Sequence, residues 1–322
     1  MRRWRGLDAT PGDLGRTVVT IGMYDGVHRG HQVLIGAAVA RARAMRRPAL
    51  LLTFDPHPAE VIRPGSHPAI LTSMDRKAEL VAELGVDAMC VLPFTQEFMR
   101  LPPETFTHTV LVEHLHAAQV VVGQNFTYGH KAAGTVQTLA QEGRRFGFSV
   151  EGIPLAEEAS DDGEITISST YIRACVAAGD MESAARALGR PHRVDGVVVR
   201  GDRRGRDLGY PTANVETPPF TAIPADGVYA GHLVLRDAAG ASVSRHPAAV
   251  SVGTNPTFQG TRRTVEAFLL DFDGDLYGEH VAVEFAHRLR PMASFDGVEQ
   301  LVEAMGRDVE DTRRLLAVPP SS

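Results

Sequence analysis

Cysteine and long apolar runs are scarce in this sequence. Among its 322 residues there are two cysteines, Cys90 and Cys175, which lie in apolar surroundings without the spacing of a metal or redox motif. We therefore interpret both as small core residues. No stretch approaches the roughly 20 consecutive apolar residues that span a bilayer, and no apolar signal core follows the basic start. These absences predict a cytoplasmic protein without a membrane partner.

An excess of positive charge is also missing. The chain has 33 Lys and Arg against 39 Asp and Glu, a formal net charge of −6. A general nucleic-acid binder needs extra cations to neutralise phosphates, so this balance argues against nucleic acid as a partner. Small anionic ligands still fit, because a local site can be basic on an acidic protein. Lysine occurs only at positions 77 and 131 among many arginines, which we attribute to base composition.

The length and composition indicate two globular domains. The sequence is 43% hydrophobic and 22% charged, close to the globular average. A chain of 322 residues is too long for one small core and fits two of ordinary size. Gly189 and Pro191 punctuate a helical connector. We therefore predict domains over residues 1–187 and 188–322.

Strand-like and helix-like segments alternate in the first domain. Apolar runs typical of strands buried on both faces, and one weaker alternating run, cover residues 17–22, 48–54, 88–94, 120–123 and 148–153. Helical patterns cover residues 32–46 and 75–84. This alternation predicts a Rossmann-like α/β domain with a doubly wound parallel sheet. Ligands of such sheets bind beyond the carboxyl ends of the strands.

The second domain has the pattern of an antiparallel β structure. Strand-like runs cover residues 193–200, 228–235, 248–252, 264–272 and 281–289. The Asp273-Gly274 turn predicts that the last two pair as a hairpin. A helix is expected over residues 298–315. We predict an antiparallel barrel or sandwich closed by this C-terminal helix.

The strongest local signal is the segment GMYDGVHRGH, from Gly22 to His31, between a predicted strand and a predicted helix. Glycines such as Gly22 and Gly30 let the backbone approach a ligand, and free NH groups at a helix start attract phosphate. His28 and His31 could donate hydrogen bonds to a triphosphate and balance charge that grows as the α-phosphate is attacked. Taken alone, H-x-x-H is more often a turn with two surface histidines. A zinc site would lack cysteines and a third ligand.

A second element of the first domain supports the phosphate interpretation. The segment SSTYIR, from Ser168 to Arg173, is typical of a helix start. The hydroxyls of Ser169 and Thr170 and the freed NH groups there would face an anion, and Arg173 could reach the same phosphates. The alternative is a plain helix N-cap.

A glycine-rich segment opens the second domain. Residues 201–215 read GDRRGRDLGYPTANV, where the glycines, among them Gly205, suit a loop over phosphates and Arg206 supplies charge. Thr212 and Asn214 lie two apart in an extended segment, so both side chains would point to one face. Both could offer oxygen ligands to ATP with Mg²⁺. A plain surface hairpin would also explain the segment.

Glu266 is the candidate base of the second domain. In the run TVEAFLL it shares a strand face with Phe268 and Leu270. A carboxylate on an apolar face costs free energy unless it is paired, so it needs a reason. Proton abstraction from a primary alcohol would be one. The alternative is an edge-strand charge that reaches solvent.

Four segments of the first domain carry a resemblance to a known family. They are GMYDGVHRGH, SSTYIR, TFDPHP at residues 53–58 and GQNFTYG at residues 123–129. Together they resemble the nucleotidyltransferase superfamily, and specifically its FMN adenylyltransferase branch. The resemblance implies that these loops line the ATP and flavin sites. It implies flavin contacts for Phe54, Pro56 and Asn125, and for Phe126.

Two positions depart from that family's pattern. Tyr24 stands where the family usually has Phe, and Thr166 stands near a point where the family often has a basic residue. We expect Gly22, Tyr24 and Gly30 to contribute to the ATP site.

The second domain is similar to the riboflavin kinase family along nearly its whole length. The similarity is carried, in order, by GRDLGYPTAN, VGTNPTF, VEAFLLDF and DLYG. It implies a six-stranded β-barrel with a flavin site against the C-terminal helices. It also implies that Thr212 and Asn214 hold magnesium and ATP and that Glu266 is the general base.

Both resemblances together cover about residues 15–315 and are similar to the bacterial bifunctional family often called FAD synthetases. That family implies phosphorylation of riboflavin to FMN by ATP, then adenylylation of FMN to FAD with release of pyrophosphate. The expected partners are riboflavin, FMN and ATP with Mg²⁺, on a monomer or weak homo-oligomer. An alternative is a flavin-binding or regulatory protein that kept both folds and lost one activity.

Overall fold

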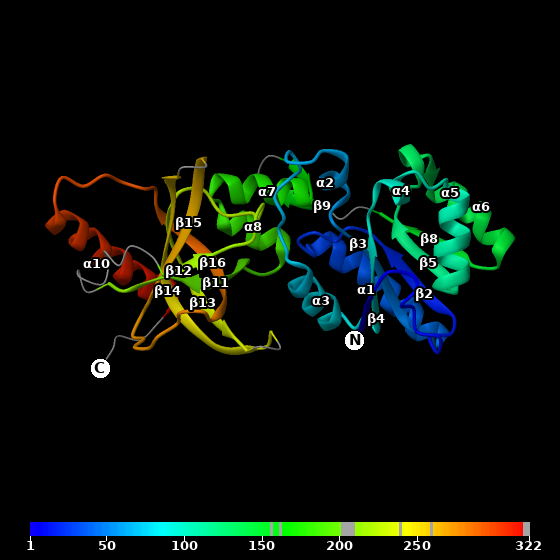
Figure 1. Ribbon diagram of the computed structural model, residues 1–322, viewed down its shortest axis with the longest axis horizontal. Coiled ribbons are helices and arrows are strands. Elements are labelled where there is room, and N and C mark those ends of the chain that lie inside the picture. Colours follow the sequence, from blue (N-terminus) through cyan, green and yellow to red (C-terminus); the bar gives the residue numbers. More distant parts are fainter. Residues whose placement is uncertain (155–156, 161–162, 201–209, 238–239, 258–259, 318–322) are drawn as a thin grey trace. The chain divides into compact units, whose positions relative to one another are not determined.

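The computed structural model forms two compact units (Figure 1). The residues it describes are 1–154, 157–160, 163–200, 210–237, 240–257 and 260–317. Unit 1 comprises Met1–Pro68 and Met74–Ser168, and unit 2 comprises Ala69–Ser73 and Ser169–Ser322.

Unit 1 is built on a six-stranded parallel sheet with the order β1-β4-β3-β2-β5-β8. The strands are β1 (Arg2–Arg5), β2 (Thr17–Ile21), β3 (Ala49–Asp55), β4 (Ala88–Pro93), β5 (Ala117–Gly123) and β8 (Ser149–Ile153). Two small antiparallel pairs accompany it: β6 (Thr127–Tyr128) with β7 (Gly134–Thr135), and β9 (Glu157–Ser160) with β10 (Gly163–Thr166).

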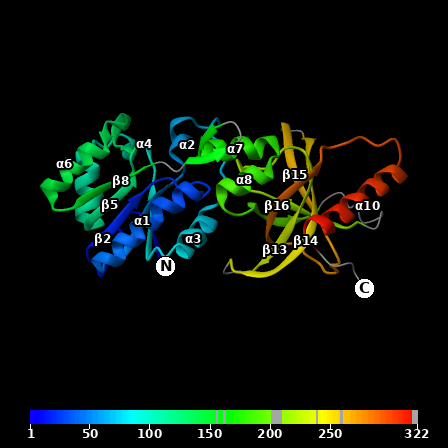
Figure 2. The same ribbon diagram turned by 180° about the vertical axis from the view of Figure 1, so that it is seen from behind.

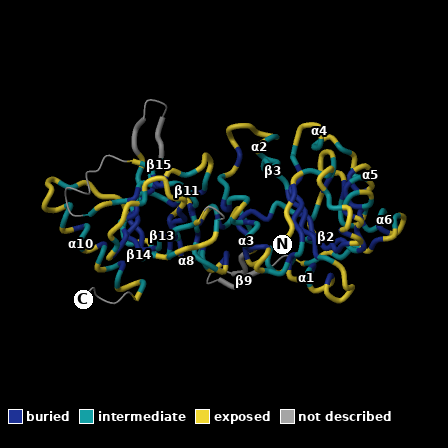
Figure 3. Tube along the Cα trace, turned by 60° about the horizontal axis from the view of Figure 1, so that its bottom comes forward, coloured by how far each residue is buried: buried dark blue, intermediate teal, exposed yellow. Residues whose placement is uncertain are grey.

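Helices cover both faces of this sheet. They are α1 (Arg29–Met45), α2 (Pro58–Ile62), α3 (Met74–Glu83), α4 (Gln96–Met99), α5 (Pro103–Thr105), the π-helix η1 (Phe106–His114), the 3₁₀-helix η2 (His130–Ala132) and α6 (Val136–Phe146). Successive strand residues point to opposite faces. Leu51 accordingly packs in a cluster with side chains of α1 and α3, whereas Leu50 packs in a cluster with side chains of η1 and α6. Figure 3 shows the buried residues along the strands.

In its described residues, unit 2 has two helices, a closed six-stranded antiparallel barrel and a C-terminal helix (Figure 2). The helices are α7 (Ser169–Ala178), α8 (Met181–Leu188) and α10 (Val298–Leu315). The strands are β11 (His192–Val199), β12 (Thr212–Glu216), β13 (Gly227–Arg236), β14 (Ser242–Thr257), β15 (Gly260–Leu269) and β16 (His280–Arg290). They close in the order β11-β12-β15-β14-β13-β16, and α10 packs on β13, β14 and β16.

Specific contacts join α7 and α8 to the barrel. Arg288 of β16 donates from Nη1 to the carbonyl of Ala178 at 3.2 Å. The Nδ1 atom of His287 lies 2.8 Å from a carboxylate oxygen of Glu182 in α8. The two helices therefore belong with the barrel in unit 2, although α7 and all of α8 except Leu188 precede the predicted boundary at 187/188. That boundary stays a prediction.

The short segment Ala69–Ser73 also belongs to unit 2. Ile70 forms a parallel bridge with Thr221, and its NH donates to the carbonyl of Phe220 at 2.7 Å. The hydroxyl of Ser73 donates to a carboxylate oxygen of Asp195 at 2.7 Å. This segment therefore packs with the barrel as part of unit 2.

The predicted fold class is confirmed in both halves, but one predicted turn is wrong. The Asp273-Gly274 turn does not close a hairpin, because β15 pairs with β12 and β14 while β16 pairs with β11 and β13. Closing the barrel requires the chain to cross between non-adjacent strands at this point. A turn sequence alone does not reveal that crossing.

Gly231 marks a place where the barrel has no room for a side chain. A Cβ there would lie 2.0 Å from the carbonyl oxygen of Glu284 on the neighbouring strand. The strand register shifts next to this position, between Ala230 and Gly231. The close approach of two backbones therefore requires glycine.

We predict that Gly231→Ala destabilises the protein by about 3 kcal/mol or more, because strand backbone must move to admit the methyl group. Thermal unfolding followed by circular dichroism would measure the change. Gly36→Ala in α1, where a Cβ meets nothing within 4 Å, is the matched control. It should stabilise by up to about 1 kcal/mol through helix propensity. Equal effects of the two substitutions would contradict the packing argument.

Candidate active sites

The turn between β2 and α1 holds the two predicted histidines. Tyr24, Gly26 and Val27 adopt left-handed backbone conformations, with φ of 49°, 85° and 39°. The NH of Val27 donates to the carbonyl of Tyr24 at 3.2 Å. This tight turn follows Ile21 at the end of β2 and delivers the chain to the start of α1. A polar site beyond the carboxyl end of a parallel strand is the arrangement expected for this fold.

Gly22 and Tyr24 pack against each other within this turn. A Cβ on Gly22 would lie 2.9 Å from a ring carbon of Tyr24. The Tyr24 side chain is 1% exposed, and its hydroxyl lies 2.6 Å from the hydroxyl of Thr20. Tyr24 is therefore part of the core beneath the turn. A contribution of Tyr24 to ATP binding stays a prediction.

His28 and His31 lie together at the N-terminus of α1. Their rings stack with centroids 3.6 Å apart, and the NH of His31 donates to Nδ1 of His28 at 3.3 Å. Because Nδ1 of His28 accepts, a neutral His28 carries its proton on Nε2. Nδ1 of His31 is buried without a hydrogen-bond partner among the described residues. Nδ1 of His31 therefore retains hydrogen-bonding capacity for a ligand.

Burial holds the pKa of His31 well below its usual range, and the nearby His28 and Lys77 lower it further. A neutral imidazole results at physiological pH. It can donate one hydrogen bond to a phosphate oxygen without the cost of desolvating a second positive charge.

Lys77 lies beneath the same turn. This residue of α3 is 4% exposed, and its Nζ donates to the carbonyl of Met23 at 2.7 Å. Burial lowers the pKa of Lys77 to about 8, although Asp25 and Asp55 oppose the change. The charged form therefore costs the folded state about 3 kcal/mol relative to an exposed lysine. This cost is present below about pH 8 and is relieved as the pH rises toward the ordinary lysine value.

The loops after β3 and β5 flank the turn, because these strands are the sheet neighbours of β2. Phe54 packs against neighbouring phenylalanine rings, and Pro56 follows it after a cis peptide bond. Asn125 is exposed, and Phe126 stacks on Tyr128 with ring centroids 5.6 Å apart. The predicted flavin residues thus come from strand ends on both sides of β2. Their contact with flavin stays a prediction.

The predicted helix start at SSTYIR is confirmed, since α7 begins at Ser169. Ser169, Thr170 and Arg173 belong to unit 2, where Nε of Arg173 donates to the carbonyl of Ala69 at 2.6 Å. That they share phosphates with the histidines of unit 1 stays a prediction.

The barrel contains a cavity of about 540 Å³ at β12 and the segment between β15 and β16. Thr212 and Asn214 line it, together with residues Phe272–Tyr277. Thr212 and Asn214 alternate along β12 with the buried Ala213 and Val215. The predicted common face of the two polar side chains is therefore confirmed. Gly205 and Arg206, predicted to cover the phosphates, lie outside the described residues.

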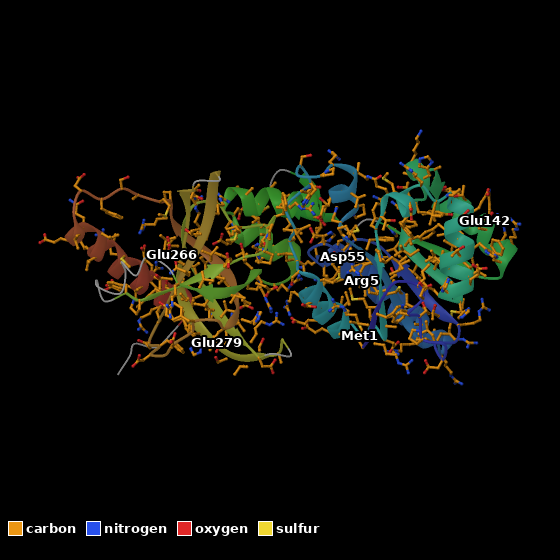
Figure 4. All side chains as sticks on the ribbon, in the orientation of Figure 1. Met1, Arg5, Asp55, Glu142, Glu266 and Glu279 are labelled. Atoms are coloured by element: carbon orange, nitrogen blue, oxygen red, sulfur yellow. The ribbon has the colours of Figure 1, made fainter. Side chains whose placement is uncertain are left out.

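A second cavity of about 280 Å³ adjoins β12 and is mainly apolar. Glu266 lies in its wall with Phe268, Met305 and other apolar side chains, and Thr212 lines both cavities. In the ladder between β12 and β15, Asn214 pairs directly with Glu266. Figure 4 shows Glu266 on the part of the barrel next to α10. The predicted base is thus placed where a polar cavity meets an apolar one.

An ion pair fastens α10 over this second cavity. Arg290 of β16 donates from Nε and Nη2 to the two carboxylate oxygens of Asp308, at 2.8 and 2.7 Å. The side chain of Asp308 is 9% exposed, and both residues line the cavity. Bidentate pairing of this kind fixes direction as well as distance.

Sequence reasoning missed Lys77, Arg290 and Asp308. The rarity of lysine was visible, but we attributed it to base composition. Arg290 and Asp308 lie in different elements and meet only once the barrel has closed. Sequence spacing therefore gives no signal for their pairing.

No cluster of three or more His, Cys, Asp or Glu that could hold a metal occurs within the described ranges. In that same part of the chain, no helix is both long and apolar enough to cross a membrane.

Comparison with known proteins assigns both halves. The family model described as FAD synthetase matches residues 10–171, and the one described as riboflavin kinase matches residues 188–316. One half of the chain is therefore of the class that makes FAD and the other of the class that phosphorylates riboflavin. The chain belongs to the bifunctional riboflavin kinase/FMN adenylyltransferase family, and it converts riboflavin to FMN and FMN to FAD.

Individual relatives cover nearly the whole chain. The bifunctional riboflavin kinase/FMN adenylyltransferase of Listeria monocytogenes is 37% identical over 304 residues, which is 93% of this chain and 92% of that protein. The Escherichia coli protein of the same name is 33% identical over 291 residues, 90% of each chain. A solved structure described as a macrolide-efflux protein from Streptococcus pneumoniae matches with a TM-score of 0.85 and 31% identity, covering 97% of this chain and 99% of that one.

We predict that Asp308→Ala raises the KM for riboflavin several-fold and destabilises unit 2 by about 3 kcal/mol, because it leaves the charge of Arg290 unpaired in a cavity wall. Kinase assays over a range of riboflavin concentrations and thermal unfolding would measure both effects. Asp311→Ala is the control, since Asp311 pairs with Arg314 on the exposed side of the same helix. That exposed pair should contribute less than about 1 kcal/mol. A wild-type KM in Asp308→Ala would contradict a role for the pair in shaping the cavity.

Proposed function

We propose that riboflavin is phosphorylated at the junction of the two barrel cavities. Riboflavin occupies the apolar cavity against α10, and the triphosphate of ATP occupies the larger polar one. The observation that carries this proposal is the β12–β15 register, which pairs Asn214 with Glu266 while Thr212 borders both cavities. Because the two cavities share Thr212, a hydroxyl group of riboflavin in one cavity and the γ-phosphate of ATP in the other would be close enough to react.

In this mechanism Glu266 accepts the proton of the ribityl 5′-hydroxyl. The hydroxyl oxygen forms a bond to the γ-phosphorus of ATP as the bond to the bridging oxygen breaks, and FMN and ADP result. Mg²⁺ enters with ATP as part of the substrate and neutralises the charge of its phosphates. The hydroxyl of Thr212 and the amide oxygen of Asn214 are ligands of the kind that Mg²⁺ accepts, and they fit this role.

The adenylyl transfer is proposed for the β2–α1 turn. A phosphate oxygen of FMN attacks the α-phosphorus of ATP, and pyrophosphate leaves as FAD forms. His28 and His31 donate hydrogen bonds to phosphate oxygens, and no covalent enzyme intermediate is required. Support comes from the stacked imidazoles at a helix N-terminus, where backbone NH groups already favour anions. Flavin is expected on the flanking loops at Phe54 and Asn125.

A cytoplasmic location and a monomer or weak homo-oligomer complete the proposal. Both reactions consume ATP, which the cytoplasm supplies.

The two-site proposal predicts that single substitutions separate the reactions. Asn214→Ala should abolish FMN formation from riboflavin and leave FAD formation from FMN unchanged, whereas His28→Ala should do the reverse. Incubation with ATP and Mg²⁺, followed by chromatographic separation of the flavins, would measure both. If either variant lost both reactions while still folded, the two-site proposal would fail.

Glu266→Gln should lower kcat of the kinase reaction by roughly 10²- to 10⁴-fold, as for loss of a general base. Glutamine keeps the shape of the side chain, so the KM for riboflavin should change little. Glu279→Gln, at an exposed carboxylate of the same barrel that is labelled in Figure 4, is the control and should be fully active. A rate within about threefold of wild type would show that Glu266 is not the base.

A further inference from the structure

Lys77 is a buried cation that the proposed chemistry does not use. Lysine side chains are almost never fully buried unless they are paired, yet Lys77 is 4% exposed. Its neighbours along the same face of α3, Leu80 and Val81, belong to an apolar cluster with Tyr24 and Val27. An apolar side chain would therefore fit the position, and the presence of an ammonium group calls for an explanation.

The ammonium group holds one carbonyl of the β2–α1 turn. Nζ of Lys77 donates to the carbonyl of Met23 at 2.7 Å, and the hydroxyl of Thr53 donates to the same oxygen at 3.2 Å. Met23 directly precedes Tyr24, whose φ is 49°. A non-glycine residue in this region is strained, and such strain persists only when surrounding contacts enforce it. Lys77 and Thr53 thus fix the backbone that leads to the histidines.

The surroundings of Lys77 keep it charged. Asp25 and Asp55 favour its protonated form, and Asp55 itself forms an ion pair with Arg5 of β1 (Figure 4). On the side of the turn, the positive charge of Lys77 disfavours protonation of His31. The charge therefore contributes to two properties of the site, which are a neutral His31 and a cation beneath the place proposed for the polyphosphate.

Burial of this charge does not serve stability. A charged group in an apolar cluster is usually less stable than a well-packed apolar residue of the same volume. A residue that costs stability and touches the backbone of a proposed phosphate turn is more simply explained by function.

We propose that Lys77 is a positioning residue of the adenylyl-transfer site, which fixes the β2–α1 turn through the Met23 carbonyl and places a positive charge beneath the polyphosphate of ATP. It acts on the turn through its hydrogen bond to the backbone and through the electrostatic field of its charge. This inference rests on the proposed location of adenylyl transfer at that turn.

The test compares Lys77→Met with wild type in the complete enzyme. Lys77→Met removes the charge and keeps an unbranched side chain that is one atom shorter. We expect kcat for FAD formation from FMN to fall on the order of 100-fold, as for misplacement of a reacting group, while the KM for FMN stays within threefold. The kinase reaction of the same preparation should be unchanged, and the unfolding temperature should not fall below that of wild type.

Three further variants complete the design. Arg41→Met removes an exposed cation of unit 1 that pairs with Glu151, and it should leave both reactions unchanged. Lys77→Gln keeps a donor for the Met23 carbonyl without the charge, so partial recovery would separate the hydrogen bond from the field. His28→Ala is measured in parallel because it tests the location of the site itself.

Each outcome decides the question. An adenylyl-transfer rate within threefold of wild type in Lys77→Met, with His28→Ala inactive, overturns the role of Lys77 alone. Activity retained in His28→Ala overturns the location of the site as well. If Lys77→Met unfolds at a lower temperature than wild type, the adenylyl-transfer rates of Lys77→Met and Lys77→Gln are measured at a temperature below the unfolding transition of Lys77→Met. A loss of activity that follows only the unfolded fraction then assigns Lys77 a merely structural role and overturns the proposal.

Discussion

The pairing of β12 with β15 is the constraint on which the kinase half depends. In an antiparallel ladder, residues directly opposite each other point to the same face. The register that pairs Asn214 with Glu266 also pairs Thr212 with Phe268, so polar side chains and an apolar cavity wall meet along these two strands. A slip of one residue would turn every one of these side chains to the other face. Closure of the barrel and α10, tied by Arg290 to Asp308, hold that register in place.

Unit 1 also brings residues from separate strands together, but it does so at the ends of parallel strands. Its sheet places the ends of β3, β2 and β5 side by side, so three loops converge without any of them being long. The apolar cluster that contains Tyr24 and Val27 supports the central loop from below. The charged side chains buried in this region, Lys77 and Asp25, lie beneath the turn with the histidines. The distribution of charge in the core thus follows the chemistry assigned to the surface above it.

Much of this could be predicted from the sequence, because each prediction depended on local pattern. The buried parallel strands have continuous apolar runs, and the helix over Val298–Leu315 has the expected bounds. β1 was missed because its four residues, RRWR, include only one apolar side chain. The mistaken hairpin at Asp273-Gly274 has a similar cause, since the turn is local whereas the choice of strand partner is made by closure of the whole barrel.

The residues of the candidate sites also divide into those that a local sequence pattern indicates and those that only packing brings together. His28, His31, Thr212, Asn214 and Glu266 lie in motifs whose spacing already places them on one turn or one strand face. Lys77 reaches Met23 across a separation of 54 positions, and Arg290 reaches Asp308 across 18. Such pairs form only when separate elements pack together, so no local sequence pattern predicts them. Roles that depend on packing are accordingly the ones that only the structure suggested.

The segment Ala69–Ser73 has a consequence for the modular appearance of the chain. It lies in sequence inside the adenylyl-transfer half but bridges to Thr221 and bonds to Asp195 on the barrel side. The polypeptide therefore passes from one unit to the other three times. A single scission after Ser168 would leave the barrel fragment without a strand-like strip that it normally pairs with. The two units thus alternate along the chain. Expressing them as separate proteins would require a replacement for the segment Ala69–Ser73 in the barrel unit.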